Sequence, residues 1–381
     1  MPTYRQDPAL FSWALSIGGS DIKHFGDMEM SWSTGGYGTS GIVSAQFKFA
    51  IPSAEHNVNA FSGGDTVILT GAGGSWTFYV QSKSDDGDGK INFVCYDRAG
   101  FVDCAYPTDT KDGTASGSTK YVPTDSSDKD EEKIYLSTVL DKIASTCGYS
   151  SCLIDGTLLD LLPQVLPSSL EGKTCRNILD DVASALVGYW AMQSASGLPA
   201  LRFFPYGATE PDISVKSVQH EMIRKGSHLQ YSGVAMTGGS ERYVSNSSSL
   251  TADHTLLEIN TSYASLELCE AVSSRVGAYI YTGWVCDNAI LTDILLPPGL
   301  VDTAGSGQLR ANHCTMSLSS QGIFAGMGAE FPDETWQYKG KVYRELDSRL
   351  KVGMSYGNVE ITNKGIQFVY VDENQNKEWG C

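Results

Sequence analysis

The chain has 381 residues, of which 41% are hydrophobic, and it carries 44 acidic against 27 basic side chains for a net charge of −17. This length exceeds a single hydrophobic core, so we expect two to four domains and a folded rather than a disordered chain. An acidic surface repels phosphate groups and anionic lipid, which argues against nucleic-acid binding and membrane insertion. We expect no signal peptide and no membrane-spanning segment.

The first 106 residues are predicted to be β-structure. Short stretches in which apolar and polar residues alternate are separated by glycine-rich turns, which is typical of a barrel or sandwich. The predicted strands are Ser12–Ile17, Met28–Trp32, Val43–Phe49, Thr66–Leu69, Trp76–Val80 and Ile91–Tyr96. The run Asp85–Gly89 predicts a hairpin loop and not a calcium loop, because Phe93 stands where calcium would need a bidentate acid.

A change of pattern follows. Residues 107–132 are rich in Asp, Ser, Thr and Gly and predict a linker, while residues 133–211 predict a small α+β domain. Apolar residues at helical spacing begin at Ile134 and stop at Gly148. Thr174 is expected to cap a second helix that ends at Gly188. A hairpin follows, with predicted strands at Tyr189–Met192 and Leu201–Phe204.

The remainder of the chain returns to β-structure around one helix, predicted from about Ser262 to Gly277. The predicted strands are Val215, Leu229–Val234, Leu256–Ile259, Trp284–Cys286, His313–Leu318, Val342–Tyr343, Val359–Ile361 and Ile366–Val371. The predicted fold class is mainly β with an α+β insertion. The predicted domains are a first β-barrel at 1–106, the linker at 107–132, the α+β domain at 133–211, a second β-barrel with a helix at 212–330 and a β unit at 331–381.

Recognisable catalytic motifs are missing, and we predict no catalytic, cofactor-binding or metal-binding residues. The cysteines are odd in number and include no CxxC pair, so reduced and mostly buried thiols are expected at Cys95, Cys104, Cys147, Cys152, Cys175, Cys269, Cys286, Cys314 and Cys381. The acidic pairs Asp180–Asp181 and Glu131–Glu132 are expected on solvated helix faces. The six histidines are expected at surface or capped positions, and the seven tryptophans in packed strands.

Three stretches, taken in order, resemble the hub proteins of phage tails, tail-like bacteriocins and contractile injection systems. The first runs through Gly64–Leu69, Thr77–Val80, Ile91–Val94, Tyr96–Arg98 and Val102–Tyr106. The second is a helix, a glycine and two strands, from Thr174 through Gly188 to Phe203. The third is Leu266–Tyr279 followed by Trp284–Asp287. Two features depart from the family: the long acidic linker, and an end at Cys381 with no lysozyme, peptidase or fibre domain.

This resemblance implies a structural role without enzyme activity. Hubs of this family form trimers in which two tube-like barrels per subunit make a pseudo-six-fold ring, and the ring joins a six-fold tail tube to a three-fold spike or fibre. The implied partners are two further copies of the chain, the tail tube protein, the spike or tail fibre, other baseplate proteins and the tape measure protein. The implied location is the virion or a released tail-like particle, assembled in the bacterial cytoplasm.

Two alternatives to the hub remain open on sequence grounds. One is a carbohydrate-binding or receptor-binding tail module that uses exposed Trp and Tyr side chains. The other is a cell-wall hydrolase, which would need paired carboxylates or a Cys–His pair in a cleft. Neither can be tied to particular residues of this sequence.

Overall fold

The computed structural model of the protein describes residues 12–35, 40–71, 74–107, 134–162, 164–165, 170, 172–195, 198–207, 216–220, 224–246, 256–303 and 307–329, and the backbone of six strands between 336 and 380. The chain separates into two compact units. The first comprises Met1–Leu250 and His254–Glu330, and the second comprises Thr251–Asp253 and Phe331–Cys381. The predicted linker at 107–132 falls almost entirely outside the described residues, as do Glu131–Glu132, Val215 and His254.

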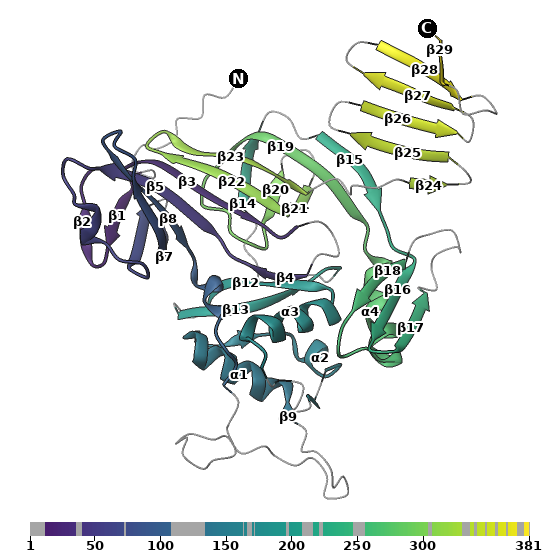
Figure 1. The fold of residues 1–381 in the computed structure, drawn as a ribbon, viewed down its shortest axis with the longest axis horizontal. Helices are drawn as coiled ribbons and strands as arrows, with labels where there is room; N and C mark the ends of the chain where they lie inside the picture. The colour runs from purple at the N-terminus through teal and green to yellow at the C-terminus, as the bar shows by residue number, and fades with distance from the viewer. Residues whose placement is uncertain are drawn as a thin grey trace, which may run out of the picture. The chain divides into compact units, whose positions relative to one another are not determined.

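The first unit is built on one fourteen-stranded sheet, which confirms the predicted mainly-β fold class (Figure 1). Seven of its strands come from the first 96 residues and pair in the order β2-β1-β6-β7-β8-β5-β3. They are β1 (Ala14–Ile17), β2 (Ser20–Ile22), β3 (Gly26–Ser33), β5 (Gln46–Pro52), β6 (Thr66–Gly71), β7 (Gly74–Asp85) and β8 (Lys90–Tyr96). The strands predicted in this part are confirmed except for Val43–Phe49, and the hairpin loop after Asp85 joins β7 to β8. The predicted strand Val43–Phe49 is divided, because Ser44 and Ala45 lie outside any strand and Val43 belongs to a strand of another sheet.

The other seven strands come from the later part of the unit and continue the same sheet. They are β14 (Lys216–His220), β15 (Arg224–Leu229), β19 (Tyr281–Leu291), β20 (Leu300–Thr303), β21 (Gly307–Arg310), β22 (His313–Ser319) and β23 (Gly322–Ala329). Their order is β22-β23-β19-β14-β20-β21, with β15 also pairing β19. We call the seven earlier strands the first half of the sheet and these the second half.

A small α+β layer follows the first half. Its sheet has the order β10-β13-β12-β4, in which β4 (Gly41–Val43), β10 (Cys152–Leu153), β12 (Gly188–Ala195) and β13 (Leu198–Pro205) take part. Two main helices accompany it, α1 (Leu136–Cys147) and α3 (Cys175–Ala185), with a short α2 (Gly156–Leu159) and a two-stranded pair of β9 (Ile134–Tyr135) and β11 (Gln164–Val165). The parallel pairing of β4 with β12 shows that residues 41–43 complete this layer from outside its predicted boundary.

The two helix ends of this layer differ from each other. Gly148 closes α1 in the left-handed conformation, as predicted, with φ of 71°. In contrast, α3 ends at Ala185, and Val187 rather than Gly188 has a positive φ, of 48°. Gly188 is required for another reason, because a Cβ there would lie 2.5 Å from the Phe203 ring and 2.5 Å from the Phe204 carbonyl oxygen.

Residues 233–278 form a separate layer of their own rather than part of the large sheet. The strands β16 (Gly233–Gly238), β17 (Glu241–Asn246) and β18 (Leu256–Asn260) make a three-stranded sheet in the order β17-β16-β18. Helix α4 (Leu266–Ala278) is capped by Ser265 and joined to this sheet by the Ser273 hydroxyl, which donates to the Ser245 carbonyl oxygen at 2.8 Å. The predicted helix is thus confirmed, within a layer that sequence periodicity did not separate from the second half.

The second unit is a six-stranded antiparallel sheet. Its strands pair in chain order and are β24 (Trp336–Tyr338), β25 (Lys341–Leu346), β26 (Arg349–Met354), β27 (Gly357–Thr362), β28 (Gly365–Val371) and β29 (Lys377–Gly380). The three strands predicted here are confirmed within β25, β27 and β28.

Among the helices that the structure describes, none combines the length and the hydropathy needed to cross a membrane.

Candidate functional site

The two halves of the large sheet meet where β3 pairs antiparallel with β22. In this pairing Met30 lies opposite Met316, and Trp32 lies opposite Cys314. All four side chains are buried. The Trp32 indole N–H also donates to the Leu295 carbonyl oxygen at 2.7 Å. An apolar seam with backbone pairing therefore fixes segments almost 300 residues apart as neighbours in one sheet.

The two ends of the sheet are open within the part of the chain that the structure describes. Among the described strands, β2 pairs only with β1 and β21 pairs only with β20. Gly18 and Gly19 connect β1 to β2 with φ of 56° and 83°, as a two-residue hairpin with two positive φ values requires. A strand edge with unpaired backbone groups is a template for pairing with another chain. Both ends of the sheet therefore offer an edge to a partner.

Asp97, in the Tyr96–Arg98 stretch of the family resemblance, links β8 to the segments around it. Its carboxylate caps the 3₁₀ helix η3 (Arg98–Val102) through the Ala99 N–H at 3.1 Å. It also accepts from the Ser44 hydroxyl at 2.7 Å and the Ala45 N–H at 3.0 Å. Burial raises the pKa of Asp97 to about 6, against the three hydrogen bonds that favour its charged form. The Asp97 carboxylate therefore joins η3 to the segment at Ser44 and Ala45, and it carries a buried negative charge when ionised.

Arg98 ties the same segment to α1 and β7. Its Nε donates to the Cys147 carbonyl oxygen at 3.1 Å, and its Nη1 donates to the Tyr79 hydroxyl at 2.9 Å. The guanidinium carbon lies 5.5 Å from the centre of the Tyr79 ring and 5.2 Å from that of Phe101. Arg98 thus satisfies the open carbonyl end of α1 while it stacks on two aromatic rings.

The acidic pair on α3 does not form the solvated face that the sequence predicts. Asp181 accepts from the Thr261 hydroxyl at 2.8 Å, from the Ser262 N–H at 3.1 Å and from the Ser262 hydroxyl. Asp180 has a buried Oδ1 without a hydrogen-bond partner, and burial raises its pKa. The prediction failed because helical spacing shows which residues share a face but not what covers that face.

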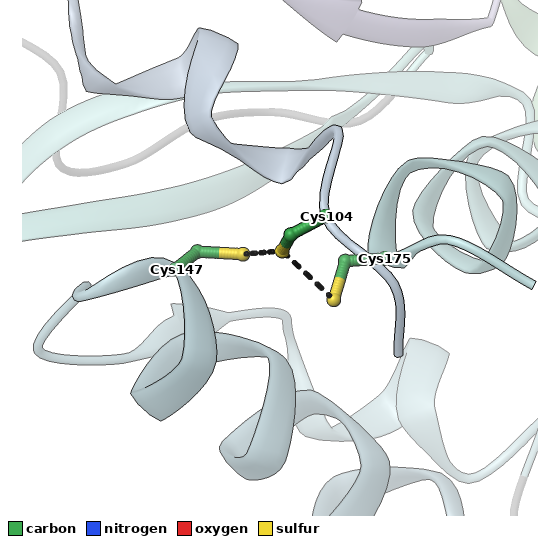
Figure 2. A group of neighbouring side chains, drawn as sticks. All are labelled: Cys104, Cys147 and Cys175. Carbon is green, nitrogen blue, oxygen red and sulfur yellow. Dashed lines mark hydrogen bonds between the residues drawn. The ribbon is translucent and has the colours of Figure 1, made fainter. Parts of the chain in front are cut away.

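Three cysteines from separate segments come together beneath η3 (Figure 2). Cys104 follows η3, Cys147 is the last residue of α1, and Cys175 is the first residue of α3. The Cys104 sulfur lies 3.7 Å from the sulfur of Cys147 and 3.7 Å from that of Cys175, and all three lie within 4.8 Å of one another. Cys147 and Cys175 are buried, and Cys104 is half-buried.

The cluster is chemically distinct from the isolated thiols of the sheet. The neighbouring Cys175 thiol and then burial raise the pKa of Cys147, and burial followed by the Cys147 thiol raises the pKa of Cys104. This group could not be predicted from the sequence, because Cys147 and Cys175 are 43 and 71 residues from Cys104 and the three form no close ligand pair. The sequence predicts only the cap at Thr174, which places Cys175 at the start of a helix.

The tryptophans of the first unit serve packing, as predicted. Trp32, Trp190 and Trp284 are buried, and the indole N–H of each donates to a backbone carbonyl oxygen. Trp13 donates to the Ser319 carbonyl oxygen at 2.9 Å and packs beside Trp76. The side chains of the last two tryptophans lie outside the described residues. The buried indoles are therefore not available as a sugar-stacking platform.

The histidines whose side chains are described do not come together. His24 pairs with Glu55 at 2.9 Å on the surface, while His56 and His313 each have a buried ring nitrogen without a hydrogen-bond partner. His24 and His56 lie in the loops before β3 and after β5, His313 is the first residue of β22, and none of the three belongs to the cysteine cluster.

In sequence, no family model and no curated protein matches the chain. In structure, the chain is similar to the 43 kDa tail protein of prophage MuSo2 from Shewanella oneidensis, with 13% identity and a TM-score of 0.47 over 84% of this chain and 97% of that one. It is also similar to the prophage tail protein gp18 from Listeria monocytogenes, with 10% identity and a TM-score of 0.47 over 83% and 94% of the two chains. An E. coli component of the type VI secretion system, described as similar to phage T4 tail proteins gp27 and gp5, gives 9% identity and a TM-score of 0.44 over 92% and 98%.

Proposed function

We propose that the protein is a structural subunit of a phage-type tail or tail-like particle and that it acts as the baseplate hub, without enzyme activity. Three copies form a ring, and each copy contributes the two halves of its sheet. The ring therefore presents six similar β-surfaces around a three-fold axis. It joins a six-fold tail tube on one side to a three-fold spike or fibre on the other.

The pairing of β3 with β22 is the observation that carries this proposal. It places two sets of seven strands in one sheet, so that each chain presents two β-surfaces in a fixed relation. The open edges at β2 and β21 supply backbone groups at opposite ends of that sheet, where neighbouring subunits can pair. A ring closes when the edge of one copy meets that of the next. The net charge of −17 per chain keeps DNA from adhering to the lumen of such a ring.

The mass of the purified protein in solution tests the proposal. Light scattering at several concentrations is expected to give three times the chain mass of 41.1 kDa, and electron microscopy is expected to show rings. A monomer at the highest concentration, both alone and in a mixture with the cognate tail tube protein, contradicts the hub role. A chain that forms only dimers contradicts it as well.

Two proline variants in β2 test whether this edge makes the subunit contact. Residues that flank a two-residue hairpin turn bond to each other, so the Ser20 N–H faces β1 and the Asp21 N–H faces the open edge. Proline removes the N–H in either case. Asp21→Pro is expected to lower the trimer fraction with little change in the melting temperature, whereas Ser20→Pro is expected to lower the melting temperature. Equal trimer fractions in Asp21→Pro and the wild type exclude β2 from the interface.

A further inference from the structure

The sulfur positions of Cys104, Cys147 and Cys175 match the coordination geometry of a metal ion. Two of the three sulfur–sulfur distances are 3.7 Å. A tetrahedral zinc ion with Zn–S bonds of about 2.3 Å separates its sulfur ligands by about 3.8 Å. A disulfide needs a sulfur–sulfur distance of about 2.05 Å. The observed spacing fits a hydrogen bond between thiols and also two edges of a zinc–thiolate tetrahedron, and it excludes a disulfide.

We propose that these three cysteines bind one zinc ion through three thiolates. Soft sulfur ligands select zinc over magnesium and calcium, which prefer oxygen. Three thiolates leave one position of the tetrahedron for a water molecule, and Cys104 is the half-buried member of the cluster. The site does not depend on the hub role, because all three ligands lie within one chain.

The charges around the cluster favour a thiolate-bound ion. Three thiolates and Zn²⁺ carry a net charge of −1. Cys175 is the first residue of α3, where the positive end of the helix dipole stabilises an anion. The guanidinium of Arg98 lies beside Cys147, where its Nε donates to the Cys147 carbonyl oxygen. Two positive groups thus compensate the residual charge of the loaded site.

Backbone contacts hold the three ligands in place before an ion arrives. The Cys175 N–H donates to the Cys104 carbonyl oxygen at 2.9 Å, and Ala105 forms an antiparallel bridge with Thr174. Gly148 fixes the end of α1 directly after Cys147. The three cysteines therefore need little further ordering when the ion binds. The bound ion would link α1, α3 and the segment after η3. Binding displaces the thiol protons, so affinity increases with pH.

Cobalt titration of the reduced, chelator-treated full chain tests the site. Tetrahedral Co²⁺ bound to thiolates gives intense sulfur-to-cobalt charge-transfer bands and visible d–d bands. We expect these bands to saturate at one Co²⁺ per chain and to disappear when Zn²⁺ is added. Absence of a charge-transfer band in the wild-type protein overturns the proposal, as does a band that saturates only at several equivalents.

Two serine variants identify the ligands. Cys104→Ser removes one proposed ligand, while Cys152→Ser changes a second half-buried thiol that lies outside the cluster. We expect the charge-transfer band to be lost in Cys104→Ser and kept in Cys152→Ser. Zinc is expected to raise the melting temperature of the wild type and of Cys152→Ser but not that of Cys104→Ser. Equal responses of the two variants overturn the assignment, and the wild-type titration decides the matter if Cys104→Ser does not fold.

Discussion

Trp32 on β3 donates its indole N–H to the carbonyl oxygen of Leu295, a residue 263 positions later in the chain, at 2.7 Å. The indole is buried where the first and second halves of the sheet meet, opposite Cys314 of β22. Its ring also packs against Gly299, where an added Cβ would lie 2.4 Å from the indole. One side chain thus joins the backbone of the second half to the seam between the halves.

Replacement of Trp32 by phenylalanine is expected to destabilise the fold through this contact. The Leu295 carbonyl oxygen would lose its donor in a buried place, at a cost of about 1–3 kcal/mol, and the smaller ring would leave a cavity. Chemical unfolding measures the loss. The half-buried Trp76 is the control, since Trp76→Phe should change the free energy of unfolding by less than Trp32→Phe. Equal effects would contradict the role given to the Trp32 hydrogen bond.

The adjacent acids Asp180 and Asp181 are expected to respond in opposite ways to alanine. Asp181→Ala removes the acceptor of Thr261 and Ser262 and should cost about 2–3 kcal/mol. Asp180→Ala removes a buried oxygen that has no hydrogen-bond partner, and should be neutral or stabilising. Thermal unfolding of both variants measures the contrast. A larger loss in Asp180→Ala than in Asp181→Ala would refute this interpretation of α3.

Gly148, at the end of α1, and Gly172, in a turn before α3, form a matched pair for the cost of a side chain at positive φ. Both have φ of 71°, so alanine at either position carries the same left-handed strain of about 1–2 kcal/mol. At Gly172 nothing lies within 4 Å of an added Cβ, whereas at Gly148 the Cβ would lie 2.1 Å from Arg98 Nη2. Displacement of Arg98 weakens its bonds to Tyr79 and to the end of α1.

We therefore expect Gly148→Ala to lower the free energy of unfolding by about 1–2 kcal/mol more than Gly172→Ala. Urea denaturation of the two variants measures this difference. Addition of Arg98→Ala should remove most of it, because the atoms that clash with the new Cβ are then absent. If the difference persists in the Arg98→Ala background, the close approach of Arg98 is not its cause.

Asp97 should make the protein less stable as the pH rises, whereas a carboxylate paired with a cation makes a protein more stable as the pH rises. Its pKa rises from 3.8 to about 6 on folding, so the folded state binds a proton more tightly than the unfolded state. The contribution of Asp97 to the free energy of unfolding is greatest below pH 3.8. It decreases by about 3 kcal/mol as the pH rises from 3.8 to about 6. Asp97→Asn cannot ionise, so it should lack this loss.

The difference in unfolding free energy between the wild type and Asp97→Asn isolates this group from the other acids. We expect the difference, wild type minus variant, to fall between pH 4 and pH 6 and to stay level above. Asp103 is the control, because its bond to Arg176 lowers its pKa. For Asp103→Asn the corresponding difference should rise with pH instead. A flat difference for Asp97→Asn would show that its charge is not desolvated.

Local sequence signals determined most of the secondary structure. Alternation of apolar and polar residues placed the strands of the first half because their side chains meet a core on one face and solvent or another layer on the other. Thr174 could be identified as a helix cap because it precedes an apolar stripe at helical spacing. In the structure the side chains of Thr174 and Asn177 accept from each other's backbone N–H groups. Gly148 was identified as a helix end because it adopts positive φ without strain. Each of these signals spans only a few residues.

Only the tertiary structure decided which of these elements meet. The pairing of β3 with β22, the addition of β4 to the α+β sheet, the bonds of Asp181 to Thr261 and Ser262, and the cluster at Cys104 all join residues that are tens to hundreds of positions apart. Periodicity assigns a residue to a face but does not name the segment that covers it, because that choice depends on the packing of the whole chain. The strands and helix ends could therefore be predicted from the sequence, while the seam, the buried acids and the three-cysteine site could not.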